Sequence, residues 1–339
     1  MKLHDYQRSI LWALIVGGVA ISLPLVAETY TLINATIYVS AAIFALSLAL
    51  IWGYGGILCF GQAAFFGLGG YAYALTSINF GDTTLAIPIA VATATIFAVM
   101  LGYFLFYGRL GDVYLGVITL TVTLILFKLI NSTAGDAYRV GKARLGGFNG
   151  IPNTPPLNWP FQPDHIATPG ETYVAASVAL VLLYAFCKWL LVTRFGRAVI
   201  AIRENEVRAE LLGYNSRLVK LAIFSIGAAI AGLSGAVFAT TVFVSPTMFS
   251  LGAAAQVLIW VIVGGLGTLV GPIIGSIVVQ MLTSALGTVE WINPNFVLGV
   301  VLVAVVLVAP KGLMHVFELL KTVTRKKRLG PEESAHDQA

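Results

Sequence analysis

The chain has 339 residues, of which 58% are hydrophobic and only 10% are charged, whereas soluble domains average about a quarter charged residues. Fifteen acidic and twenty basic side chains are too few to cover a soluble protein of this length, so much of the surface must face lipid. The composition excludes a disordered, fibrous or nucleic-acid-binding chain and predicts an all-α, multi-pass transmembrane bundle.

The first apolar stretch, residues 10–26, follows Lys2 and Arg8 and has about the length of a secretory signal peptide. No small-x-small cleavage site comes after it, because Leu25, Val26 and Ala27 precede Glu28. We therefore expect a retained first helix whose N-terminus lies in the cytoplasm.

Nine further stretches are apolar, and most of them are close to the roughly 20 residues that one crossing needs. In chain order they are 33–52, 57–77, 85–107, 113–130, 173–191, 218–242, 252–263, 269–286 and 296–308. The total is ten spans, or eight or nine if the short segment near Ala255 does not cross. Residues 1–320 are thus expected to form one transmembrane domain, followed by a basic and then polar tail, 321–339, expected to be disordered.

Lys and Arg collect beside two membrane ends, in residues 188–220 and in the tail. The positive-inside rule places both segments in the cytoplasm, and two cytoplasmic termini require an even number of spans, as ten provides. The loop 131–172 argues against this scheme, since it is placed outside and yet carries Arg139, Lys142 and Arg144. Long loops weigh less in the rule, so we keep the assignment.

The segment 194–216 is the one long polar helix pattern between spans. Its apolar residues Ile200, Val207 and Leu211 share one face, with charged residues on the neighbouring face, and Glu204 precedes Arg208 by the favourable four residues. Gly213 is expected to end the helix, and Asn215 or Ser216 to cap the next one. On these residues alone, the helix lies on lipid headgroups or docks a partner.

Glycines recur at helical spacing in the later spans. Gly267, Gly271 and Gly275 would share one helical face, and Gly232 and Gly235 lie on the preceding long span among small residues. Small residues let two helix backbones approach closely in a membrane. Packing within one subunit is the ordinary interpretation, and a subunit contact or pore wall is the alternative.

No catalytic, metal or nucleotide site is apparent in the sequence, so no cofactor and no enzyme activity are expected. The four histidines are scattered, Cys59 and Cys187 lie in apolar stretches, and the phosphate-binding GxxxxGK[ST] motif is absent. The charges within spans, Lys128, Lys188 and Lys220, lie near helix ends, where they can reach the interface. Without an ion relay or a nucleotide site, energy for uphill transport must come from a partner.

Seven motifs in order resemble the permeases of bacterial ABC importers, in particular the branched-chain amino acid permease family. The order Arg-Glu-Asn-Glu, then Ala-Glu, then Gly in residues 203–213 is similar to the coupling loop of those permeases. The other matches are IWGYGGILCFGQAAFFGLGGYAYAL (51–75), RLGDVYLGVITL (109–120), LGGFNGIP (145–152), FVSP (243–246), VIVGGLGTLVGPIIG (261–275) and APKGL (309–313). They cover roughly residues 33–315.

The resemblance implies a pore in the bacterial inner membrane, made with a homologous second permease. Two cytoplasmic ATPases would supply the energy, and a periplasmic binding protein would deliver the substrate. The residues it implies for ATPase coupling are Arg203, Glu204, Glu206, Val207, Arg208, Leu211 and Gly213. Those implied for the external loop are Gly146, Gly147, Asn149 and Gly150.

The translocation path is expected to be neutral, because the spans offer amides and hydroxyls but no charge at depth. Candidates are Gln62 and Gln256, then Thr119 and Thr121, although the Gln side chains serve equally well as bonds between helices. A neutral path suits a branched-chain amino acid zwitterion or, as the alternative substrate, urea or a short amide. An ion-coupled carrier, an intramembrane enzyme and a purely structural membrane protein are the other classes considered.

Overall fold

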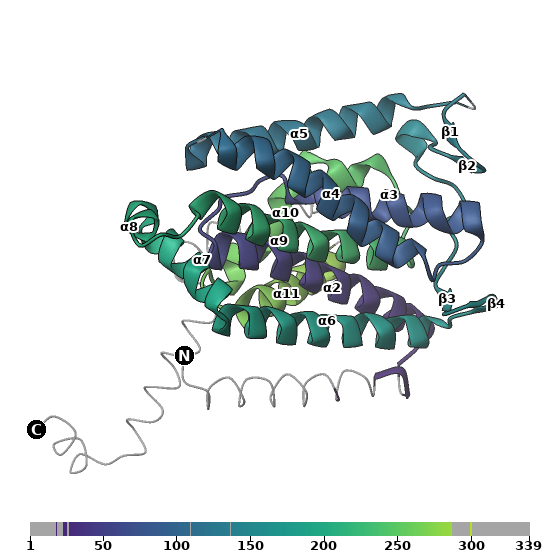
Figure 1. Cartoon of the computed structure of the whole chain (residues 1–339). Coiled ribbons are helices and arrows are strands. Elements are labelled where there is room, and N and C mark those ends of the chain that lie inside the picture. The colour runs from purple at the N-terminus through teal and green to yellow at the C-terminus, as the bar shows by residue number, and fades with distance from the viewer. Residues whose placement is uncertain are drawn as a thin grey trace, which may run out of the picture.

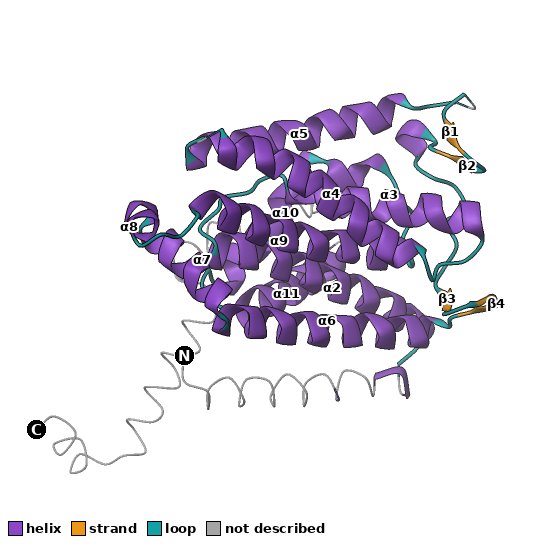
Figure 2. Cartoon of the chain, viewed as in Figure 1, coloured by secondary structure: helices purple, strands orange, loops and turns teal. Residues whose placement is uncertain are grey.

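Helices make up nearly all of the computed structural model, which describes residues 18, 23–25, 27–108, 110–135, 137–286 and 299 (Figure 1, Figure 2). The expected first span at 10–26 lies outside the described residues apart from Gly18 and the short turn η1 (Leu23–Leu25). The expected last span at 296–308, apart from Gly299, and the tail 321–339 also lie outside them.

Among the described residues, five helical segments are long and apolar enough to cross a membrane. They are α2 (Thr29–Leu48) with its π-helical extension η2 (Ala49–Tyr54), α4 (Ala86–Tyr107), α5 (Asp112–Ser132), α6 (Pro169–Val192) and α9 (Ser216–Ala239). These segments coincide with predicted spans, because long apolar runs satisfy every backbone group only as helices in lipid. The chain is an α-helical membrane protein.

Three shorter or less apolar helices complete the bundle: α3 (Gln62–Phe80), α10 (Leu251–Gly264) and α11 (Val270–Leu286). At 1.5 Å per residue, the 14 residues of α10 extend about 21 Å, less than the roughly 30 Å hydrocarbon core of a bilayer. The helix expected over 57–77 begins five residues late, at Gln62, because residues 55–61 are not helical. This irregular segment is nevertheless buried, with Ile57 2% and Cys59 1% exposed.

Two groups of short elements mark opposite ends of the bundle (Figure 1). At one end lie α7 (Arg194–Glu204) and α8 (Glu206–Leu211), between α6 and α9. At the other end, after α5, β1 (Arg139–Val140) pairs antiparallel with β2 (Ala143–Arg144), and β3 (Asn158–Trp159) pairs with β4 (Gln162–Ile166). We call these the α8 end and the hairpin end.

Glycines bring the central helices together. A Cβ on Gly232 would lie 2.5 Å from the Ala94 Cβ of α4, and a Cβ on Gly235 would collide with the Phe66 carbonyl of α3. Gly271 and Gly275 of α11 face α10 in the same way, at Gly264 and Trp260. All four glycines thus lie at close helix contacts within this chain.

One glycine departs from the predicted helical face. Gly267 lies in the turn before α11, with φ +96°, and a Cβ there would meet nothing within 4 Å. The expectation that Gly267 shares a helix with Gly271 and Gly275 is wrong, because α11 begins only at Val270.

We expect Gly235→Ala to lower the thermal stability of the purified protein, because the added methyl group meets backbone rather than a movable side chain. Overpacking of this kind costs about 1–3 kcal/mol. Gly252→Ala is the matched control in a helix, since the nearest atom to its Cβ is the Ser250 Oγ at 3.5 Å. Unfolding midpoints measured in detergent decide the question, and equal midpoints for the two variants would contradict the packing argument.

Candidate functional site

The polar segment at the α8 end is two helices rather than the single amphipathic helix predicted. Asn205 separates them with an extended backbone, φ −161° and ψ 102°, and its side chain accepts a hydrogen bond from the Arg208 N–H at 2.9 Å. The predicted Glu204–Arg208 helix pair is therefore wrong, because the two residues lie on different helices. Glu204 pairs instead with its neighbour Arg203, at 2.5 Å.

Helix α8 is held to the first turn of α9 by its two glutamates. Glu206 Oε2 lies 2.6 Å from Lys220 Nζ, and the Ser216 hydroxyl donates to Glu210 Oε1 at 2.5 Å. Gly213, with φ +88°, follows α8, and Asn215 caps α9 by accepting from the Leu218 N–H at 3.1 Å. Both the turn and the cap follow the sequence prediction.

Next to these glutamates, α8 and its C-cap Leu212 present apolar side chains to the outside. Val207 is 68% exposed, Leu211 83% and Leu212 78%. Sequence reasoning found Val207 and Leu211 but missed Leu212, whose only signal was its place beside Leu211 at the end of the helix. Exposed apolar residues grouped on a helix mark a contact surface, and we call these three the α8 face.

The Arg203 side chain reaches from α7 to the π-helical end of α2. Its Nη1 donates to the Gly53 carbonyl of η2 at 2.6 Å, while its Nε and Nη2 donate to Glu204. Next to Gly53, the Tyr54 hydroxyl donates to the Gly267 carbonyl in the α10–α11 turn at 3.0 Å. The network thus joins α7, the end of α2 and the α10–α11 turn.

A cavity of about 590 Å³ lies among α2, α3, α9, α10 and α11. Its walls are mainly apolar and aromatic, and its polar groups are hydroxyls and two amides, Gln256 and Gln280. None of the described residues lining it carries a charge. The residues that line the cavity are Ile37, Ser40, Ala41, Phe44, Phe66, Phe238, Val242, Phe243, Ser245, Thr247, Met248, Ser250, Gly252, Ala253, Gln256, Trp260 and Gln280.

Of the four residues predicted for the path, the structure brings only Gln256 to this cavity. Gln62 is buried at the start of α3, where its Nε2 donates to Ser47 Oγ at 2.8 Å and to the Gly227 carbonyl at 3.2 Å. Thr119 is buried in α5, and Thr121 is exposed on α5. Gln280 was missed, since its only signal is an amide within an apolar run.

The glycines of the loop after α5 shape a tight turn at the hairpin end. Gly146, Gly147 and Gly150 have φ values of +69°, +52° and +74°, which favour glycine. The Ile151 N–H donates to the Val244 carbonyl at 2.9 Å and so holds the turn against the segment that follows α9. Asn149 is exposed beside Phe148. The turn therefore leaves two side chains open to a partner.

A second polar cluster at the hairpin end joins the α3–α4 loop to β3. Asn158 Nδ2 donates to Asp82 Oδ1 at 2.9 Å, and the Thr84 N–H and hydroxyl donate to the same oxygen at 2.8 and 2.7 Å. These hydrogen bonds, that of Asn158 first, lower the pKa of the Asp82 carboxyl from its ordinary value.

We expect Asp82→Asn to lower the unfolding midpoint at pH 7. An aspartate whose folded-state pKa is lowered contributes stability that is complete above its unfolded pKa of about 4 and is lost as the pH falls through the folded value. The difference between wild type and variant should therefore be constant from pH 8 to 5 and shrink below about pH 4. Asp164→Asn, on the exposed strand β4, is the control. A difference that grows on acidification would contradict the assignment.

Comparisons with known proteins connect this architecture to transport. A family model described as the permease component of branched-chain amino acid transport systems matches residues 29–306. The high-affinity branched-chain amino acid transport system permease protein LivM of Escherichia coli K12 is 29% identical over 332 residues, covering 91% of this chain and 75% of that protein. Its Salmonella typhimurium counterpart is 27% identical over 323 residues, with the same coverage.

A more distant relative matches only part of the chain. The autoinducer 2 import system permease protein LsrC of Escherichia coli O157:H7 is 30% identical over 135 residues, which is 37% of this chain and 39% of that protein. No solved structure matches the chain.

Proposed function

Because the chain belongs to the family of permease components of branched-chain amino acid transport systems, we propose that its uncharged cavity carries branched-chain amino acids across the inner membrane. The observation that best supports this proposal is the chemistry of the cavity lining, which has apolar and aromatic walls with a few hydroxyls and the amides of Gln256 and Gln280. Such a site accommodates an apolar side chain and can hydrogen-bond an ammonium and a carboxylate, and its volume is typical of ligand pockets.

The proposal includes a topology of ten spans with both termini in the cytoplasm. The α8 end, rich in arginine, would then be cytoplasmic, and the hairpin end would face the periplasm. Successive described helices support this arrangement: α5 runs to the hairpin end, α6 returns to α7, and α9 leaves α8 again (Figure 1). Residues 1–320 form the permease domain, with an external loop at 131–172, a coupling loop at 194–216 and a cytoplasmic tail at 321–339.

In this proposal, two ATPase subunits dock on the α8 face and hydrolyse ATP, while this chain itself is not catalytic. Val207, Leu211 and Leu212 supply an apolar helix surface of the kind that fits a groove in a soluble partner. Arg208 lies beside that surface, and Glu206 holds α8 in place through Lys220. Alternating access then follows from two conformations that the ATPases stabilise differently.

Two further partners belong to the proposal. A homologous second permease completes the pore, with lipid around both chains, and a periplasmic binding protein delivers the substrate at the hairpin end. The exposed Phe148 and Asn149 in the Gly146–Gly150 turn lie where such a protein would arrive. Gln62, Thr119 and Thr121, which do not line the cavity, have no role in this path.

Urea or a short amide is the second candidate substrate, favoured by the two amides in the cavity lining, Gln256 and Gln280. Uptake by the complete complex in liposomes, measured with labelled leucine, isoleucine, valine, urea and acetamide, decides between them. We expect ATP-dependent uptake of the three amino acids that persists when ionophores collapse ion gradients. Uptake of urea alone would favour the second candidate, and uptake abolished by ionophores would instead indicate a secondary carrier.

A further inference from the structure

The cavity is closed toward the α8 end. The α2 residues that line it end at Phe44, and the residues that follow, from Ala45 to Ile51, are each at most 2% exposed. On α10 the lining ends at Trp260, after which Val261 and Val263 are at most 2% exposed. At its α2 and α10 walls, the cavity is therefore closed at this level.

Three aromatic rings form the floor of the cavity. Phe44 stacks on Phe66 with ring centroids 4.6 Å apart, and Trp260 meets Phe44 edge-on at 6.3 Å. Since the rings come from α2, α3 and α10, a movement of α10 away from the other two helices would open the floor. We call these three rings the aromatic floor.

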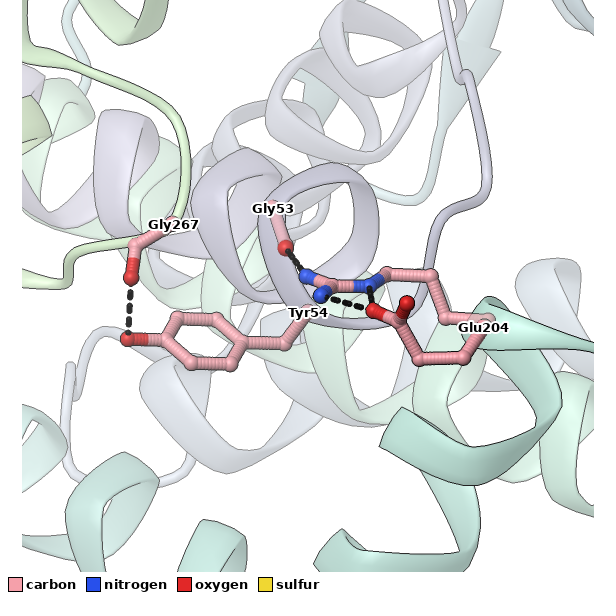
Figure 3. A network of polar contacts seen from close by, with 5 residues as sticks. Gly53, Tyr54, Glu204 and Gly267 are labelled. Carbon is pink, nitrogen blue, oxygen red and sulfur yellow. Dashed lines mark hydrogen bonds and ion pairs between the residues drawn. The ribbon is translucent and has the colours of Figure 1, made fainter. Parts of the chain in front are cut away.

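Below the aromatic floor, a single side-chain hydrogen bond joins the end of α2 to the α10–α11 turn. The Tyr54 hydroxyl donates to the Gly267 carbonyl at 3.0 Å (Figure 3). At this crossing the backbones are close, because a Cβ on Gly53 would lie 3.4 Å from the Gly267 nitrogen. The turn itself is exposed, with Leu266 45% exposed.

Helix α7, which precedes the α8 face, contacts the same part of α2 through Arg203. Arg203 Nη1 donates to Gly53, the residue before Tyr54, at 2.6 Å, and the Arg203 stem packs against Gly56, whose φ is +69°. A shift of α7 and α8 would thus move Gly53 and Tyr54 relative to Gly267. Hydrogen bonds are short-ranged, so a displacement of about 1 Å is enough to break the Tyr54 contact.

We propose that Tyr54 is the latch of an inner gate: its bond to Gly267 holds α10, and with it Trp260, against the aromatic floor until movement of α7 through Arg203 releases it. This inference rests on the proposed function, since it assumes that the cavity is the transport path. Tyr54 is a positioning residue, because it lies outside the cavity lining and acts through α10. Release lets the α10–α11 turn swing outward and opens the cavity to the cytoplasm.

The test uses Tyr54→Phe, which removes only the hydroxyl, in the complete complex. A cysteine introduced by Val263→Cys reports opening through its reaction with a membrane-impermeant maleimide, because Val263 lies below the aromatic floor and is only 2% exposed. The native Cys59 and Cys187 are buried. We expect labelling about five times faster in the Tyr54→Phe background without ATP, the factor that loss of one net hydrogen bond gives. Tyr114→Phe, at a position 69% exposed, is the matched control and should leave labelling unchanged.

The second measurement is leak of labelled leucine from loaded liposomes without ATP, which should rise by a similar factor. Equal labelling in the Tyr54→Phe and Tyr114→Phe backgrounds would overturn the latch. The latch would also be overturned if Tyr54→Phe lowered the unfolding midpoint and increased labelling throughout the protein, because the substitution would then destabilise the whole fold. Labelling requires no substrate, so it tests the latch even if wild-type complexes fail to take up leucine. Failure to take up leucine would overturn the proposed substrate and not the latch.

Discussion

The double substitution Val207→Glu/Leu211→Glu is expected to abolish ATP-driven uptake and to release the ATPase subunits from the purified complex. The two side chains are 68% and 83% exposed and become buried in the partner's groove in the proposed complex. Burial of a Val and a Leu contributes about 3 kcal/mol or more together, and its loss weakens docking at least about a hundredfold. Copurification of the ATPases and uptake in liposomes measure the two effects.

The fold of the variant should be unaffected, because other side chains hold α8 to α9, in the Glu206–Lys220 and Glu210–Ser216 contacts. The matched control is Val207→Ile/Leu211→Met, which keeps the surface apolar and should retain uptake within about threefold. Wild-type uptake by the glutamate variant would show that the ATPases dock elsewhere. Loss of copurification in both variants would show that shape, and not apolar character, decides the contact.

Ala253→Trp is expected to reduce uptake by at least about tenfold, with the ATPases still bound. Ala253 lies on the cavity wall, one helical turn before Gln256. An indole there occupies space that the substrate needs, and the cavity offers no second uncharged route among its described walls. Substrate-stimulated ATP hydrolysis should fall in parallel, because the binding protein can no longer hand over its ligand.

The matched control is Ala92→Trp, on the exposed side of α4, where a tryptophan faces outward and not into the cavity. Both variants add the same side chain to a membrane helix, so only the position differs. Uptake that fell equally in both would indicate a general defect of insertion. Undiminished uptake in Ala253→Trp would place the path outside this cavity.

The membrane helices could be predicted closely, because a long charge-free run in lipid has one way to satisfy its backbone. The stretch predicted at 85–107 is helical from Ala86 to Tyr107. The breaks were harder. The helix ends at Gly55 and Gly56, where Gly56 has φ +69° and Arg203, about 150 positions away in sequence, packs against it.

The coupling segment, residues 194–216, likewise has features that could be predicted from the sequence and features that could not. Its caps at Asn215 and its stop at Gly213 are local and were predicted. The break at Asn205 was not, since an asparagine between two glutamates is compatible with a helix until its side chain turns back to cap the Arg208 N–H. Glu206 was expected on a partner surface, but Lys220 draws it inward.

The cavity could be predicted in character but not in detail. Neutral lining followed from the absence of charge at depth, whereas the choice among buried amides depended on which helix faces meet. Gln62 finds its partners at Ser47 and Gly227 and is thereby removed from the cavity, while Gln256 and Gln280 face it. In sequence these three amides are equivalent.

The uncharged lining of the cavity has an electrical consequence. A zwitterion carries no net charge. The described cavity walls, from Ile37 to Gln280, hold no charged side chain, so no wall charge moves with the substrate when the helices shift. Moving one elementary charge across 100 mV costs about 2.3 kcal/mol, so a neutral path spares the cycle this term. The transport rate should therefore be the same in polarised and depolarised vesicles, and a cell could import its substrate without drawing on or dissipating its membrane voltage.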